Sequence, residues 1–269
     1  MGFISTVKNV FSDSSKKKVL AINLYGTLAE DSSMSNNCFP VFNLINTLYD
    51  IADDKSYKGI LLRINSPGGA AAASEELAQA LLLIKQAGIP VVTSIGDICA
   101  SGAYLVASVT DKIFANKMSL VGSIGAIIQI PNFTGLAEKL GVKFITSSAG
   151  KMKDIGNPFR DMTDEEKEYF DRLTILAAKK FINIVTFHRQ LKDITKMTDG
   201  RIVDASEALD NNLIDSFGTY HDAFICLCEK MNIPQERVII EEYEVKRPLI
   251  KRILGLTSLN SLFNISLKF

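Results

Sequence analysis

KGILLRINSPGG (residues 58–69) and PVVTSIGDICASGAY (residues 90–104) each combine an apolar, β-rich run with a turn of small residues. Between them, apolar residues recur at helical spacing over residues 74–86. This order predicts a strand–helix–strand unit, and the right-handed crossover of such units makes the two strands parallel.

Parallel strands present their carboxyl ends at the same edge of a sheet, where open α/β sheets bind ligands. The turn after the first strand carries Gly68 and Gly69, and the second strand is followed by Ser101. We therefore expect the backbone N–H groups of the two glycines near the serine. A serine that faces such donors has the geometry of acyl transfer.

The rest of the chain repeats the alternation of strands and helices, which predicts an α/β fold with parallel pairing. A capping box of Thr163 and Glu166 predicts the start of a long helix, and Asp204 with Glu207 starts another. The further expected strands are 18–28, 111–115, 124–130 and 142–147, and the further expected helices are 39–51, 101–109 and 135–140.

Composition narrows the classes of function. The chain has 269 residues with 47% hydrophobic content, enough to bury the core of one large domain. Its 30 basic and 30 acidic side chains cancel, so nothing in the charge favours nucleic acid as a partner. The four cysteines form no CxxC pattern and there are only two histidines. We expect reduced, mostly buried thiols, no metal site and no cofactor.

The chain is expected to form three segments: a short amphipathic stretch at 1–18, the main domain at 19–247 and an apolar tail at 248–269. No apolar run reaches the length of a membrane span, and no signal peptide is recognisable, so we expect a bacterial protein in the cytoplasm or at the membrane periphery. The apolar face of residues 3–11 beside three lysines could contact an anionic membrane, or form a frayed or partner-packed helix. The tail is expected to pack on this or a neighbouring subunit.

A nucleophilic serine needs a base, and two kinds are open. His188, on the apolar stripe of the long helix, and His221, in a late polar stretch, could complete a triad in space. A lysine kept neutral by burial is the other common base. Lys151 and Lys153 lie two apart in AGKMKDIGNPFR (residues 149–160) and share a face if this stretch is extended.

Five motifs, in order, resemble the signal peptide peptidase A family, serine peptidase family S49, over roughly residues 19–230. They are IxSPGG, ASGAY, LVGSIGAI, AGKMKDIGNPFR and GRIVDASEALDNNLIDSFG. The resemblance implies an α/β, ClpP/crotonase-like fold built from repeated β-β-α units, and a Ser–Lys dyad.

The family's functional residues match positions of these motifs. Ser101 in ASGAY corresponds to the nucleophile, and Lys153, the second lysine of GKMKD, to the general base. Ser123 in VGSIG corresponds to a serine that orients the lysine. Gly69 corresponds to the oxyanion-hole donor, with Gly68 shaping the turn. The resemblance thus favours Lys153 over His188 and His221 as the base.

The resemblance also implies substrates and assembly. Family members cleave hydrophobic peptides such as remnant signal peptides, and nucleophile and base can come from adjacent subunits of a homo-oligomeric ring. Many members carry an N-terminal membrane anchor, whereas here only the short amphipathic start is recognisable. Two alternatives stay open: a crotonase-type acyl-CoA enzyme, and a non-catalytic assembly protein on the same fold.

Overall fold

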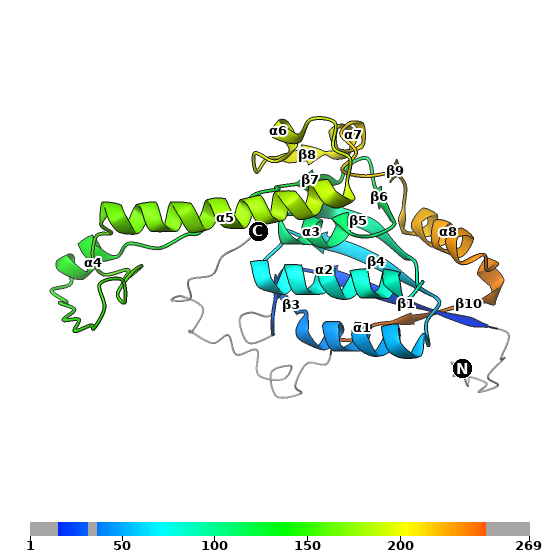
Figure 1. Ribbon diagram of the computed structural model, residues 1–269, viewed down its shortest axis with the longest axis horizontal. Coiled ribbons are helices and arrows are strands. Elements are labelled where there is room, and N and C mark those ends of the chain that lie inside the picture. The colour runs from blue at the N-terminus through cyan, green and yellow to red at the C-terminus, as the bar shows by residue number, and fades with distance from the viewer. Residues whose placement is uncertain (1–15, 32–36, 246–269) are drawn as a thin grey trace, which may run out of the picture.

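The computed structural model describes residues 16–31 and 37–245, and a mostly parallel sheet is its centre (Figure 1). The strands of this sheet are β1 (Lys17–Tyr25), β4 (Gly59–Ser66), β5 (Val91–Ala100), β6 (Lys112–Ala115), β7 (Leu120–Gly122), β8 (Ile202–Asp204), β9 (Ser216–Phe217) and β10 (Val238–Glu242). Their order is β10-β1-β4-β5-β6-β9, with β7 beside β5 and β8 beside β7. All these pairings are parallel except that of β7 with β8. The predicted α/β fold with parallel pairing is confirmed.

The predicted strand–helix–strand unit is present as β4, α2 (Ala71–Gln86) and β5. β4 and β5 pair in parallel from Ile60 opposite Val91 onward. The apolar residues that predicted the helix, Leu77, Leu81 and Ile84, are all buried. Their spacing placed them on one face, and that face now packs in the main core.

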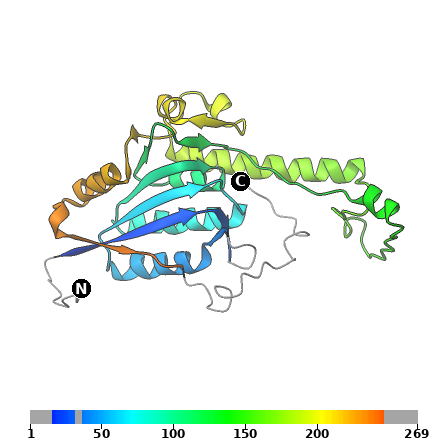
Figure 2. The ribbon, with the colours of Figure 1, turned by 180° about the vertical axis from the view of Figure 1, so that it is seen from behind.

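Helices cover both faces of the sheet (Figures 1 and 2). α1 (Phe42–Asp54), α2, α3 (Gly102–Ser108) and the C-terminal half of α5 (Asp164–His188) share one core with alternate strand residues such as Ile22 and Leu62. The intervening residues, such as Val19 and Leu61, pack on the other face against α8 (Tyr220–Met231). The two cores follow from the alternation of side chains along each strand. The remaining elements are β2 (Thr27–Ala29), β3 (Cys38–Pro40), α4 (Thr134–Lys139), α6 (Ile194–Met197), α7 (Ala205–Asp210) and a 3₁₀ helix, η1 (Gln235–Arg237).

The long helix α5 begins at the predicted capping box of Thr163 and Glu166. Its C-terminal half lies over α3, with Ala177, Phe181 and Val185 buried. Its N-terminal half projects beyond the sheet and carries α4 and the loop between the two helices at its far end (Figures 1 and 2). We call this projection, residues 127–176, the arm.

The strands predicted at 124–130 and 142–147 are wrong, because the structure has no regular strand in either stretch. In the second, Phe144 is 50% exposed and Ile145 is 98% exposed. A strand needs a neighbour for its backbone hydrogen bonds, and the arm offers none in the described part of the chain. The apolar residues of these stretches therefore do not reflect pairing in the sheet of the described chain.

No helix in residues 16–31 or 37–245 combines the length and the apolar character that crossing a bilayer requires. The amphipathic face predicted at residues 3–11 and the apolar tail at 248–269 lie outside the described residues.

Candidate active site

Ser101 lies at the point where β5 ends and α3 begins. Its backbone has φ 55° and ψ −130°, an unfavourable conformation for a residue with a Cβ atom. Its N–H donates to the carbonyl of Gly122 at 2.8 Å, which helps to hold the turn. Only 9% of the residue is exposed. Strained backbone of this kind concentrates at functional sites, where the surrounding contacts maintain it.

The glycine turn after β4 packs directly against this serine. Gly68 has φ 100°, and a Cβ at this position would lie 2.7 Å from the Cβ of Ser101 and 2.8 Å from the nitrogen of Gly102. The turn is fixed by Leu28, whose N–H donates to Gly68 and whose carbonyl accepts from Ala70, both at 2.8 Å. The predicted proximity of turn and serine is confirmed.

The N–H of Gly69 has no acceptor within residues 16–31 and 37–245. It lies between the two backbone hydrogen bonds that join the turn to Leu28. The N–H of Gly102 opens α3, where the first N–H groups of a helix have no partner inside the helix. The turn and the helix start therefore present two backbone donors beside Ser101. The sequence reasoning missed Gly102, because it sought the donors only in the turn of Gly68 and Gly69; the available signal was the position of Gly102 directly after Ser101, at the start of the expected helix.

Ser123 is brought to the same edge of the sheet by β7. Gly122, the residue before it, pairs with Ala100 and accepts the N–H of Ser101. Ser123 also has a positive φ of 55°, and its N–H donates to the carbonyl of Arg201 at 2.6 Å. The antiparallel pairing of β7 with β8 thus supports the backbone on which both serines lie.

Lys153 is not brought to Ser101 within one chain. It lies in the loop between α4 and α5, which Figure 1 shows at the far end of the arm from α3. Its side chain is exposed, and its N–H donates to Gly150 at 3.1 Å. The stretch is a series of turns and is not extended, so the condition under which Lys153 and Lys151 would share a face is not met. Lys151 instead forms an ion pair with Glu165.

Arg160 holds the turn that carries Lys153, and the sequence reasoning missed it. Its Nε donates to Asp154 Oδ2 at 2.7 Å, and its Nη2 donates to the Asp154 carbonyl at 2.8 Å. The same guanidinium donates to both carboxylate oxygens of Glu166, at 2.9 and 2.6 Å. The base candidate is therefore tied to the N-terminus of α5 through its neighbour Asp154. The available signal was the position of Arg160, which ends the lysine motif six residues before Glu166 of the capping box.

Glu166 should make the stability of the chain depend on pH. Hydrogen bonds from Arg160 and from the N–H of Thr163 lower the pKa of Glu166 from 4.5 to about 2. A depressed carboxylate pKa stabilises the fold above the ordinary value and loses that effect as the pH falls toward the folded value. We expect Glu166→Gln to lower Tm at pH 7 and the difference from wild type to narrow as the pH falls from about 4.5 toward 2.

Thermal melts of both chains across this range measure the difference. Glu168→Gln, an exposed change on the same helix, is the matched control, and its Tm should stay close to that of the wild type across this range. A difference in Tm between Glu166→Gln and wild type that stays constant with pH would contradict this account.

Neither histidine is placed to activate Ser101. His221 is on α8, which packs on the opposite face of the sheet from α3. His188 ends α5 and lines a separate cavity with Arg189 and Leu209. Cys99, next to the site in sequence, is fully enclosed, and burial raises the pKa of its thiol, so it offers no competing thiolate.

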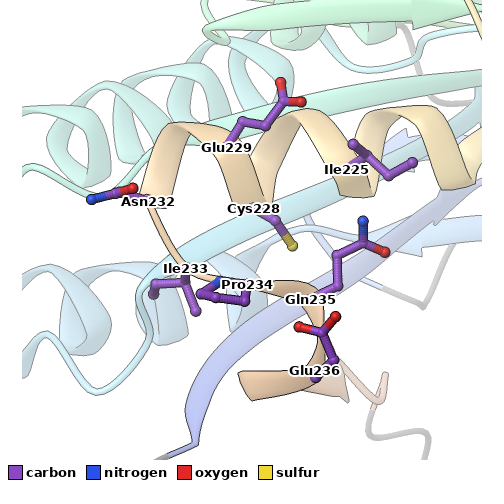
Figure 3. Close-up of a pocket in the computed structure, with 8 residues that line it drawn as sticks. All are labelled: Ile225, Cys228, Glu229, Asn232, Ile233, Pro234, Gln235 and Glu236. Carbon is purple, nitrogen blue, oxygen red and sulfur yellow. The ribbon is translucent and has the colours of Figure 1, made fainter.

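A hollow of about 350 Å³ between α8 and η1 is separate from these residues (Figure 3). The residues that line the hollow include Cys228, Glu229, Gln235 and Glu236. Because α8 lies on the face of the sheet opposite α3, this hollow is not part of the site around Ser101.

A strained serine at a helix start, beside two backbone N–H groups without an acceptor in the described residues, is the arrangement expected of a serine hydrolase on an α/β fold. The family model of peptidase family S49 matches residues 84–233. A putative signal peptide peptidase SppA of Enterococcus faecium is 34% identical over 239 residues, which cover 87% of this chain and 70% of that protein. A putative protease of Methanocaldococcus jannaschii is 37% identical over 90% of this chain and 78% of that protein. The chloroplastic serine protease SPPA of Arabidopsis thaliana is 30% identical over 76% of this chain and 30% of that protein.

The chain belongs to peptidase family S49 and is a serine peptidase. Membership of a peptidase family favours hydrolysis of peptides over the acyl-CoA and assembly alternatives that the sequence left open.

Gly69 should tolerate no side chain. A Cβ at this position would overlap the backbone carbonyl of Leu28 and would lie 2.6 Å from its nitrogen. Relief of that overlap must move the turn and its free N–H, so we expect Gly69→Ala to lower kcat for a peptide substrate by about 10²-fold or more. Gly135→Ala, whose Cβ would meet open space on α4, is the control. An unchanged kcat for Gly69→Ala would remove this N–H from the reaction.

Proposed function

We propose that the chain is an endopeptidase of ClpP/crotonase-like fold that cleaves apolar peptides with a dyad of Ser101 and Lys153. The observation that carries the proposal is the packing of the strained Ser101 turn against the Gly68–Gly69 turn, which leaves the Gly69 N–H without an acceptor in the described part of the chain. Such a donor suits the oxyanion that forms when a hydroxyl attacks a peptide carbonyl.

The reaction follows from these groups. The uncharged Lys153 amine takes the proton of the Ser101 hydroxyl as the serine oxygen bonds to the peptide carbonyl carbon. The Gly69 and Gly102 N–H groups stabilise the negative oxygen of the tetrahedral intermediate. The C–N bond then breaks, and the protonated lysine gives its proton to the leaving amine. Water, deprotonated by the same lysine, releases the acyl group, while Ser123 orients the amine of Lys153.

The position of Lys153 supports a site shared between two copies of the chain. The loop between α4 and α5, which contains the lysine, lies at the far end of the arm from α3, the helix that Ser101 precedes (Figure 1). The arm also exposes apolar side chains around a hollow of about 290 Å³ that is lined by Phe133, Leu136, Leu140, Val142, Phe144 and Phe159. Apolar surface of this kind is typical of interfaces. We therefore propose that the arm packs on a neighbouring copy and brings Lys153 to its Ser101, and that a head-to-tail interface repeated in this way closes a ring.

The proposed substrates are hydrophobic peptides such as remnant signal peptides, in keeping with the name of the Enterococcus faecium relative, a putative signal peptide peptidase. The division into a peptidase domain at 19–247 with short segments on either side is part of the same proposal. A location in the cytoplasm or at the membrane periphery stays a prediction from the sequence.

Hydrolysis of a fluorogenic apolar peptide by the purified chain tests the proposal. Cleavage by the wild type that is lost in both Ser101→Ala and Lys153→Ala supports the dyad. Cleavage that survives Lys153→Ala would assign the base to another group.

A further inference from the structure

The end of α5 is fastened to one short segment, residues 212–215. Arg189 directly follows this helix, and its own N–H donates to Val185 at 2.7 Å. Its Nε and Nη2 donate to the carbonyl of Asn212 at 3.1 and 2.9 Å, and its Nη1 donates to Asp215 Oδ2 at 3.0 Å. The arginine side chain is 9% exposed. A buried guanidinium with its fork occupied in this way is a directional connection and not only a charge pair.

The same segment also holds the helix that begins with Ser101. Tyr104, fully buried in α3, donates its hydroxyl to the carbonyl of Leu213 at 2.8 Å. Burial raises the pKa of Tyr104, so the phenol keeps the proton it donates. The Tyr104 N–H in turn donates to the Ser101 carbonyl at 2.8 Å.

Strand β6 fixes the segment to the sheet. Asp215 Oδ2 accepts the N–H of Ile113 at 2.7 Å, and the N–H of Asp215 donates to the Ile113 carbonyl at 2.9 Å. Residues 212–215 are therefore an anchored point to which α3 and α5 are both tied.

Apolar packing holds α5 to the core only along its C-terminal half. The buried side chains of that half, Ala177, Phe181 and Val185, form one row toward the core, and the partly buried Ile182 and Ile184 pack beside them. A cavity of about 360 Å³ is lined by His188, Arg189 and Asp215, among others, so one side of the helix end faces this cavity. At the helix end, the polar contacts of Arg189 add a directional constraint, beside one hydrogen bond from Asn212 Nδ2 to the carbonyl of Gln190 at 2.7 Å.

The length of α5 magnifies any error at this end. The helix has 25 residues, which corresponds to about 37 Å. A swivel of about 5° at Arg189 would therefore move the far end of the helix by about 3 Å. That displacement is as large as the whole hydrogen-bond distance over which a base must take a proton.

We propose that Arg189 is a positioning residue that sets the direction in which the arm presents Lys153, because it ties α5 to the segment that also holds the Ser101 helix. The proposal rests on the proposed function, in which Lys153 is the base. Arg189 touches neither the substrate nor the reacting atoms, and it acts through α5.

The first experiment measures the direction of the arm without any need for activity. Spin labels on Glu76→Cys in α2 and Lys139→Cys in α4, both exposed positions, report the distance from body to arm by pulsed electron spin resonance. Cys226 is replaced by serine, and labelled chains are diluted with unlabelled ones. Arg189→Lys keeps the charge and loses the fork, so we expect the mean distance to shift or the distribution to widen by about 3 Å.

Arg237→Lys, an exposed change on η1, is the control and should leave the distribution unchanged. If circular dichroism shows that Arg189→Lys does not fold, Arg189→Gln takes its place, because it keeps a hydrogen-bond donor and loses both the charge and the fork that holds the Asn212 carbonyl. An unchanged distance distribution in the folded variant overturns the proposal.

The second experiment asks which chain needs the arginine. In a mixture of Ser101→Ala and Lys153→Ala chains, each competent site takes its lysine from the first chain and its serine from the second. We expect Arg189→Lys to lower kcat about tenfold when it is on the lysine-supplying chain, with KM unchanged, and to change kcat by less than about twofold on the serine-supplying chain. Equal losses on both chains would reveal a general structural role and overturn the proposal.

The two experiments separate the two claims. A mixture without activity would contradict the shared site of the proposed function, while the label distances would still decide whether Arg189 directs the arm.

Discussion

Replacement of Ser101 by alanine is expected to lower kcat/KM for a fluorogenic apolar peptide by about 10⁴-fold or more while Tm changes little. The variant lacks the oxygen that bonds to the peptide carbonyl, so no acyl-enzyme forms. The turn itself depends on backbone contacts, such as the hydrogen bond from the Ser101 N–H to Gly122, and these remain. The residual rate reports what the free N–H groups achieve with water as the nucleophile.

Ser108→Ala is the matched control for this change. Ser108 is buried on the same helix, and its hydroxyl donates to the carbonyl of Leu105 at 2.7 Å, away from the helix start. We expect this variant to lose some stability and to keep its activity. Mass spectrometry after treatment with a fluorophosphonate should find the adduct on Ser101 in the wild type and in Ser108→Ala. A Ser101→Ala chain with more than about a tenth of wild-type activity would exclude this serine as the nucleophile.

The part of the site around Ser101 could be predicted because its determinants are local. The strand, the glycine turn and the helix lie within residues 58–109, and their apolar spacing fixes which faces pack together. Once β4 and β5 are parallel, Gly68 and Ser101 must emerge at the same edge of the sheet. Few other arrangements bury the same residues.

The arm could not be predicted in the same way, because some of its apolar residues, such as Phe144 and Ile145, are exposed and lie in neither core of the described chain. Residues 142–147 contain β-branched and aromatic residues typical of a strand, but the arm gives them no strand to pair with in the part of the chain that the structure describes. The position of Lys153 depends on Arg160 and Glu166, which contact each other across a turn with no periodic signal. The resemblance to a family could name the lysine, but only the structure shows its distance from the serine of the same chain.

Replacement of Lys153 by alanine is expected to lower kcat about 10³-fold or more and to leave the fold intact. The side chain is exposed on its own chain, so its loss removes a proton acceptor and little packing. Lys151→Ala is the matched control. It breaks the ion pair of two exposed side chains, Lys151 and Glu165, and pairs of this kind contribute little to stability. We expect that variant to retain wild-type kcat.

The decisive measurement mixes the two inactive chains, Ser101→Ala and Lys153→Ala, under conditions in which subunits exchange. If the arm of one copy supplies the base to its neighbour, an equal mixture contains a complete site wherever a Ser101→Ala chain offers its lysine to a Lys153→Ala chain. Each of the two subunits is of the required kind half of the time, so activity should return to about a quarter of the wild-type value. A mixture that stays inactive although exchange is demonstrated would mean that each chain must bring its own lysine to its own serine. The arm would then have to fold back over α3, and the exposed apolar residues around Phe144 would have to be covered by the same chain.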